Sequence, residues 1–144
     1  MKSYTDLEQS KKLAEFLPLE SADMRYGYIA PYEFSDRMYE GGYDNVPYPK
    51  DFLEKNPNFS ENDYDDSLPC WSLAALLSVL PVMIDYKGSI IRLRMDKGNV
   101  GQDDYAIWYD DLDNGLSTNI ASEAKNFIDA AYEMILKLHE QKLL

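Results

Sequence analysis

The side chains that could carry chemistry are a single cysteine, a single histidine and several runs of carboxylates. Cys70 is the only thiol of the chain and His139 the only imidazole. Nucleophilic catalysis needs a histidine beside the nucleophile, and nothing in the spacing of these two residues indicates such a pair. We expect Cys70 to pack as a small hydrophobic residue near the start of a helix, although a cysteine at a helix N-terminus can also be a reactive thiolate. We expect His139 to interact with the dipole at the end of the last helix.

The acidic runs suggest a metal site, but their spacing does not support one. With Asp110 at position 1 of a calcium loop, Gly115 falls correctly at position 6, but Ala121 stands at position 12, where a bidentate glutamate is required. A turn between two strands explains residues 110–115 better. The run at 61–66 is interpreted as a solvated loop. We therefore predict no metal site.

Motifs for phosphate binding, dinucleotide binding, a nucleophilic serine or zinc proteolysis do not occur in the chain. We predict no catalytic or cofactor-binding residue, and no cofactor. An undetected enzyme or small-ligand binder stays an alternative. Such a protein would need a pocket that brings polar groups such as Cys70, Arg92 and Tyr105 together.

The overall charge narrows the classes of partner. The 144 residues carry 26 acidic and 14 basic side chains, a net charge of −12. Because nucleic-acid affinity comes largely from cations that neutralise phosphates, direct binding to DNA or RNA is not expected. An anionic membrane surface repels such a chain for the same reason. Acidity of this kind serves solubility or attracts a basic protein.

A long acidic and tyrosine-rich segment is the most distinctive part of the chain. Between residues 36 and 66 there are nine acidic side chains and three basic ones, and six of the twelve tyrosines lie between residues 26 and 48. Tyrosine supplies a large contact area at a low cost in entropy. We therefore predict a protein-interaction module whose partner is a basic protein. The alternative is an acidic mimic of nucleic acid that inhibits a DNA-binding protein. The candidate surface is Tyr39, Tyr43, Tyr48, Asp63, Asp65 and Asp66.

Three helices are expected from apolar periodicity. The first covers about 5–17, with Thr5 as N-cap, and Pro18 ends it. A second follows Ser67, with Pro69 in its first turn and leucines of residues 73–80 on its buried face. The third covers about 124–140, and either Asn126 with Asp129 caps its start or the helix begins one turn earlier, at Ser122.

Alternating residues predict an antiparallel meander between the second and third helices. Strands are expected at 89–95, 105–109 and about 116–120, and residues 82–86 form either a further strand or the entry to the sheet. Arg92 and Arg94 share the outer face of the first strand, where they would neutralise Asp104 or Asp110 across the hairpin.

The expected fold class is therefore α+β. About three strands of antiparallel meander pack with two to three helices, and residues 20–66 form a long irregular segment. Residues 1–144 are expected to form one domain. The longest apolar run, at 73–84, is shorter than the roughly 18 residues that cross a membrane, no signal peptide precedes it, and a lone thiol suits a reducing compartment. These features favour a cytoplasmic protein.

Parts of the chain resemble two known groups of proteins. Residues 69–81, 131–140 and 9–24 are similar to a family of small proteins without an assigned function from gut bacteroidete genomes and their phages. This resemblance implies a bacterial or phage accessory protein and no activity. The meander followed by a helix that begins near Ser122-Glu123-Ala124 resembles the HicB-type antitoxin domain, which implies a small basic toxin as partner.

Overall fold

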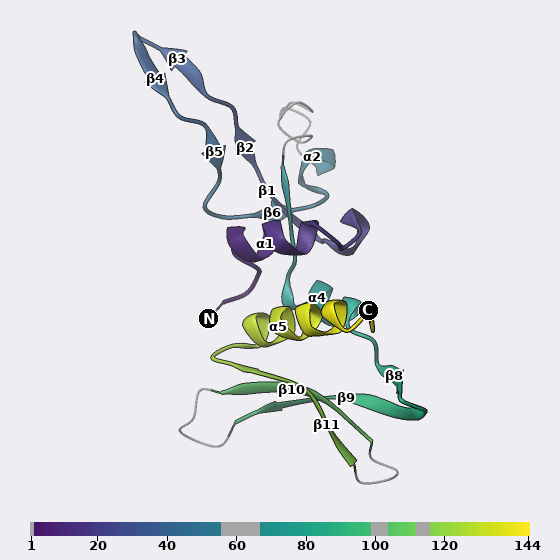
Figure 1. The fold of residues 1–144 in the computed structure, drawn as a ribbon. Coiled ribbons are helices and arrows are strands. Elements are labelled where there is room, and N and C mark those ends of the chain that lie inside the picture. The colour runs from purple at the N-terminus through teal and green to yellow at the C-terminus, as the bar shows by residue number, and fades with distance from the viewer. Residues whose placement is uncertain (1, 56–66, 99–103, 112–115) are drawn as a thin grey trace. The chain divides into compact units, whose positions relative to one another are not determined.

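A computed structural model describes residues 2–55, 67–98, 104–111 and 116–144. The chain divides into two compact units, one formed by Thr5–Ser72 and the other by Met1–Tyr4 with Leu73–Leu144. Each unit combines helices with small antiparallel sheets, so the predicted α+β class is confirmed (Figure 1). The strands are more numerous than the three or so that the sequence indicates. Whether the two units fold cooperatively as one domain stays a prediction.

The unit Thr5–Ser72 is built around a three-stranded antiparallel sheet of order β6-β1-β7. The helix α1 packs against β7, and residues 28–43 form two further short ladders, β2 with β5 and β3 with β4. The described part of the predicted irregular segment therefore contains six short paired strands. The elements are α1 (Leu7–Ala14), the 3₁₀ turn η1 (Leu19–Ser21), β1 (Met24–Tyr26), β2 (Tyr28–Ile29), β3 (Tyr32–Phe34), β4 (Arg37–Tyr39), β5 (Gly42–Tyr43), β6 (Tyr48–Pro49), α2 (Phe52–Lys55) and β7 (Leu68–Cys70).

The first helix begins later than its sequence pattern indicates. Asp6 is the N-cap: its carboxylate accepts a hydrogen bond from the Gln9 backbone N–H at 2.9 Å, and the Gln9 side chain accepts one from the Asp6 N–H. The predicted N-cap, Thr5, is instead fully buried. The prediction of Thr5 was wrong because the fold uses the Thr5 hydroxyl in the interior, whereas the adjacent Asp6, a residue type at least as favourable at this position, caps the helix.

The second helix also differs from its prediction. Residues 68–70 form the strand β7, which pairs with β1, and the helix α4 covers only Leu73–Val79. Pro69 is compatible with this strand because β7 lies at the edge of its sheet, where a missing N–H is tolerated. Cys70 therefore lies in a strand and not at a helix N-terminus.

The second unit consists of α4, a four-stranded meander and the long helix α5. The sheet has the order β11-β10-β9-β8, and α5 lies along one of its faces (Figure 1). The strand predicted at 89–95 extends to Lys97, and residues 82–86 contribute a true strand. The elements are β8 (Met83–Tyr86), β9 (Ser89–Lys97), β10 (Tyr105–Asp111), β11 (Leu116–Ala124) and α5 (Phe127–Glu140).

The helix α5 contributes more buried apolar residues to this unit's core than any other described element, as its apolar stripe predicts. Met134, Ile135 and Leu138 are fully buried. Asn126 caps its start, accepting a hydrogen bond from the Asp129 N–H at 2.8 Å, so the predicted cap is confirmed. The Lys2 ammonium forms an ion pair with Asp129 at 2.7 Å, which ties the first residues of the chain to α5.

Arg92 and Arg94 lie on strand β9 as predicted, with Asp110 opposite Arg92 and Trp108 opposite Arg94. Within the described ranges, however, neither arginine forms an ion pair with a carboxylate. The predicted neutralisation of Asp104 or Asp110 is therefore absent from this part of the chain.

None of the helices among the described residues is long and apolar enough to cross a membrane.

Candidate interaction site

Five of the exposed large apolar side chains among the described residues lie on a two-stranded ribbon formed by residues 28–43, hereafter the arm (Figure 1). At its tip, Phe34 pairs with Arg37, so Ser35 and Asp36 alone make the turn. Both turn residues have positive φ, 50° and 57°. Two consecutive residues in this region define a type I′ turn, whose twist matches that of the strands it joins. The tip is therefore a regular β-hairpin.

The two faces of the arm tip carry different side chains. Because side chains alternate along a strand, Tyr32, Phe34, Arg37 and Tyr39 share one face, and Glu33 and Met38 share the other. The rings of Tyr32 and Tyr39 stack across the ladder, with centroids 4.9 Å apart and planes 9° from parallel. Phe34 is 66% exposed and Met38 is 72% exposed. Every residue from 31 to 40 is exposed, and the arm tip projects from the rest of its unit (Figure 1).

The base of the arm is held by packing and by a close backbone approach. Tyr28 packs against Tyr43 with ring centroids 5.1 Å apart, and the Lys11 ammonium of α1 lies 5.8 Å from the centre of the Tyr43 ring. The Asp44 N–H donates to the Gly27 carbonyl. A Cβ atom on Gly41 would lie 2.0 Å from the Ile29 carbonyl oxygen. Only glycine fits this point, where the two strands of the arm approach each other.

The arm carries more negative than positive charge. Its three carboxylates are Glu33, Asp36 and Glu40, and its single cation is Arg37. All four side chains are exposed. The arm thus combines exposed aromatic and apolar side chains with a net charge of −2, the difference between one cation and three anions.

The structure brings together only part of the candidate surface that the sequence indicates. Tyr39 lies on the arm tip and is 38% exposed. Tyr43 packs at the arm base, and Tyr48 lies in β6, where its ring packs against Phe52 with centroids 5.3 Å apart. These two tyrosines therefore support the fold of the unit. Asp63, Asp65 and Asp66 lie outside the described residues.

The most exposed arm residues, Phe34 and Met38, are missing from the sequence-based set. The sequence contains a weak indication of a hairpin at this place, since residues 32–39 include β-forming residues on both sides of a polar pair. Ser35-Asp36 is not one of the pairs typical of a type I′ turn, which are Asn-Gly, Asp-Gly and Gly-Gly. The hairpin therefore escapes recognition from sequence.

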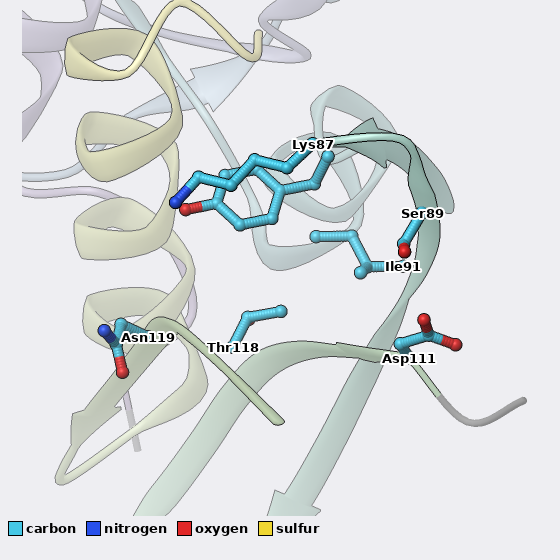
Figure 2. A pocket seen from close by; sticks show the side chains of 7 residues that line it. Lys87, Ser89, Ile91, Asp111, Thr118 and Asn119 are labelled. Carbon is cyan, nitrogen blue, oxygen red and sulfur yellow. The ribbon is translucent and has the colours of Figure 1, made fainter. Parts of the chain in front are cut away.

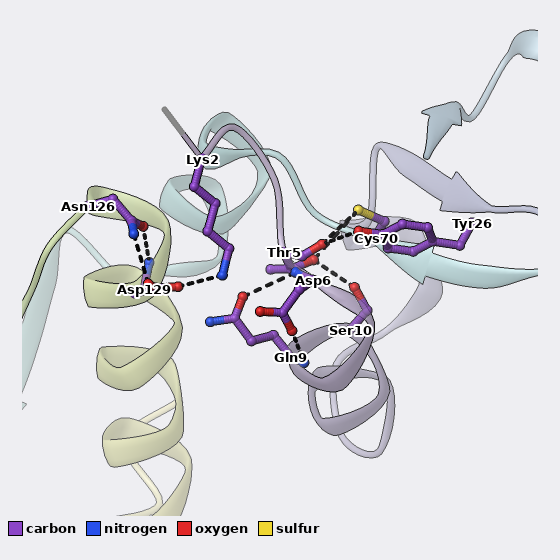
Figure 3. A network of polar contacts seen from close by, with 9 residues as sticks. All are labelled: Lys2, Thr5, Asp6, Gln9, Ser10, Tyr26, Cys70, Asn126 and Asp129. Atoms are coloured by element: carbon purple, nitrogen blue, oxygen red, sulfur yellow. Dashed lines mark hydrogen bonds and ion pairs between the residues drawn. The ribbon is translucent and has the colours of Figure 1, made fainter. Parts of the chain in front are cut away.

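Cys70 belongs to a buried polar cluster in the same unit (Figure 3). The Thr5 hydroxyl lies 2.8 Å from the Ser10 hydroxyl, 3.6 Å from the Cys70 sulfur and 3.1 Å from the Trp71 N–H, whose hydrogen bond it accepts. The Cys70 thiol and the Tyr26 hydroxyl both donate to the Thr5 carbonyl. These contacts join the start of α1 to β7 and β1, which makes the role of Cys70 structural.

The Cys70 thiol is expected to be unreactive while the protein is folded. Burial raises its pKa, with opposing contributions from its hydrogen bonds to Thr5 and Ser10, so the neutral thiol is favoured. Because the unfolded thiol, with a pKa of about 8.5, ionises first, this group stabilises the folded state below that pH and loses its contribution as the pH rises further. We expect a disulfide reagent at pH 8 to modify Cys70 only after denaturant is added. Rapid modification of the native protein would contradict this prediction.

A hollow at the turn between β8 and β9 is the main candidate for an undetected catalytic site. Its walls include Ser89, Asp111 and Thr118. Figure 2 shows the Lys87 ammonium and the Asp111 carboxylate on opposite sides of this hollow. The Lys87 ammonium lies 5.0 Å from the centre of the Tyr86 ring. The charged groups of this hollow do not point to a common position. Catalysis by a pair of charged groups requires that both reach the same reacting atoms.

The remaining chemical candidates do not assemble into a site. Cys70 is fully buried, and neither Arg92 nor Tyr105 lines the hollow at the β8–β9 turn. His139 is exposed in the last turn of α5, where it was predicted. No group of three or more His, Cys, Asp or Glu side chains able to hold a metal ion occurs within the described parts of the chain. Residues 112–115 of the supposed calcium loop lie outside them.

Comparison of the chain with protein-family models, with curated proteins and with solved structures finds no match. The resemblances to the bacteroidete and phage family and to the HicB-type domain therefore stay predictions. The arm is the strongest candidate site because its exposed side chains have no role in the packing of its own unit.

Proposed function

We propose that the protein is an interaction module that uses its arm to bind a basic protein. The observation that carries this proposal is the exposure of Phe34 and Met38 on opposite faces of one regular hairpin. Large apolar side chains that contact nothing in their own unit are typical of protein-binding surfaces. Aromatic residues are enriched at the centres of such surfaces, and Tyr32, Phe34 and Tyr39 provide three of them on one face.

The charge of the arm favours a basic partner over a second copy of this chain. Three carboxylates surround the apolar side chains of the arm, and the chain as a whole has a net charge of −12. Two such surfaces repel each other, whereas a basic surface gains faster association and specificity from complementary charge. The partner that fits is a protein with an apolar groove and a basic rim.

The proposal is tested with the double variant Phe34→Ser, Met38→Ser in comparative affinity purification from cells that carry the gene. The matched control is Leu19→Ser, which removes a side chain that is 50% exposed in the same unit but outside the arm. We expect the wild type and the control to retain the same basic proteins in the purification. The arm variant should lose them. With the purified partner, loss of two central apolar contacts should weaken binding by roughly a hundredfold, because each such contact contributes about 1–2 kcal/mol.

The melting temperatures of both variants are expected to stay close to that of the wild type, since the substituted side chains are largely exposed. The affinity of the wild type for the basic partner should also fall as salt concentration rises. Identical sets of retained proteins for wild type and arm variant would refute the proposed role of the arm. Binding that does not change with salt would refute the basic partner.

The proposal includes the cellular compartment and the biological origin of the protein. A single buried cysteine is compatible with the reducing cytoplasm, and the resemblance to a bacteroidete and phage family favours a bacterial or phage accessory protein. A small basic toxin, as implied by the HicB-type resemblance, is one partner with the required charge. A DNA-binding protein is another.

A further inference from the structure

The unit that contains α5 has an open sheet face with a hollow beside a tryptophan. On β10, Ile107 and Tyr109 are fully buried on the side of α5, so Trp108 between them points to the opposite face. No described element of the same unit covers that face. The hollow has a volume of about 410 Å³, which is enough for a small organic group. Ala106 and Ala121, both small, also line it and leave the side of Trp108 accessible.

Carboxylates surround this hollow in an arrangement that the strand register defines. Ala106 pairs with Asp96 of β9 on one side and with Glu123 of β11 on the other. The two carboxylates therefore flank Ala106 on the same face of the sheet. Asp104, which precedes β10, is the third acidic side chain of the lining. All three are exposed, and none of the described residues that line the hollow is Lys or Arg.

A hydrogen bond fixes the orientation of the tryptophan ring. The Trp108 indole N–H donates to Asp110 Oδ2 at 3.1 Å. The other oxygen of Asp110 is buried and has no hydrogen-bond partner in the described structure, which adds negative potential beside the indole N–H. Arg94 lies opposite Trp108 but does not line the hollow. The ring thus has a defined position at the edge of an acidic hollow.

We propose that this hollow binds a guanidinium or alkylammonium group. Exposed carboxylates alone do not define a site, since most are simply solvated. Here they surround a hollow with an aromatic wall, and a cation in that position gains from the indole ring and from the carboxylates together. The group is supplied either by an arginine or lysine side chain of a protein or by a free polyamine. This site lies in the other unit from the arm, and its existence does not depend on the function proposed for the arm.

The test follows the indole N–H signal of Trp108 by NMR in the full-length protein. The chain has two tryptophans, and the variant Trp108→Phe identifies which signal belongs to Trp108. The probes are Nα-acetyl-arginine amide, spermidine and the uncharged Nα-acetyl-citrulline amide. We expect both cations to shift the Trp108 signal saturably with millimolar Kd, because each contact at an open surface contributes little. The citrulline amide should produce no saturable shift.

Substitutions of the carboxylates make the test specific. Asp96→Asn and Glu123→Gln should each weaken binding of the arginine amide by roughly two- to fivefold. The matched control is Asp85→Asn, an exposed carboxylate of β8 in the same sheet that does not line the hollow, which should leave the Kd unchanged. Tighter binding of an arginine-containing neutral peptide than of spermidine identifies a protein side chain as the source, and the reverse identifies a polyamine. No saturable shift, or an equal response to citrulline amide, overturns the proposal.

Discussion

Replacing Gly41 with alanine is expected to weaken binding through the arm strongly while the rest of the unit stays folded. The added Cβ would lie 2.0 Å from the Ile29 carbonyl oxygen and 2.6 Å from both the Ala30 carbonyl carbon and the Pro31 nitrogen. These are backbone atoms, which cannot move aside as a flexible side chain can, so the two strands must separate at this point. The aromatic face at the tip then loses its fixed orientation. We expect binding of the basic partner to weaken by on the order of thirtyfold or more, the effect of losing a hot-spot contact of about 2 kcal/mol.

The adjacent glycine provides a matched control for this prediction. A Cβ on Gly42 would meet no atom within 4 Å, so Gly42→Ala makes the same chemical change one residue away without a clash. Binding is measured by calorimetry, and the arm itself is monitored by cross-strand NOEs between the Tyr32 and Tyr39 rings. These NOEs should disappear in Gly41→Ala and persist in Gly42→Ala. If both variants bind the partner equally, the geometry of the arm is not what the partner recognises.

The unit that contains α5 could be predicted from sequence because each of its elements buries one face. Along α5 the buried residues recur at helical spacing. Buried residues alternate with half-buried ones along most of β10, and less exposed residues alternate with exposed ones along the first part of β9. When one face of a helix or strand is buried and the other is solvated, apolar residues recur along the sequence with the period of that element. The cap formed by Asn126 needs only local contacts and was found for the same reason.

The unit Thr5–Ser72 could not be predicted in the same way. The arm buries neither face, and its strands of two or three residues each are too short to show a sustained alternation of apolar and polar residues. Ser35-Asp36 is also a poor signal for its turn. The start of α1 depends on a choice between adjacent residues, Thr5 and Asp6, that only tertiary packing decides. Tertiary packing also decides the structure of β7. Its proline and the leucine-rich residues that follow it favour a helix in the sequence, but the fold pairs β7 with β1 as a strand.

The candidate site was predicted in composition but not in geometry. Tyrosine enrichment and acidity indicate the segment that contains the arm, and Tyr39 belongs to the exposed set. Tyr43 and Tyr48 have the same composition signal but pack within the unit. Exposure distinguishes these tyrosines, and exposure depends on pairings between strands that the sequence does not specify. For this reason the tests above substitute Phe34 and Met38.

Replacing Thr5 with valine is expected to destabilise the unit Thr5–Ser72 by about 2–4 kcal/mol, because each buried polar group left without its partner costs about 1–3 kcal/mol. Valine has nearly the shape of threonine but no hydroxyl. The Trp71 N–H then loses its acceptor at 3.1 Å, and the Ser10 hydroxyl loses its partner at 2.8 Å. Thr5 and Ser10 are both fully buried, so water cannot replace the lost contacts without opening the cluster. The free energy of unfolding is measured by urea denaturation, with the fully buried Trp71 as the reporter within this unit.

The conservative variant Thr5→Ser separates hydrogen bonding from packing. It keeps the hydroxyl and removes one methyl group, at a cost of about 1 kcal/mol for the lost burial. The order of stability should therefore be wild type, then Thr5→Ser, then Thr5→Val. An inverse order, with serine less stable than valine, would show that the methyl group of Thr5 matters more than its hydroxyl. In that case the cluster around Cys70 would be held by apolar packing, and the hydrogen bonds that join α1 to β7 would be secondary.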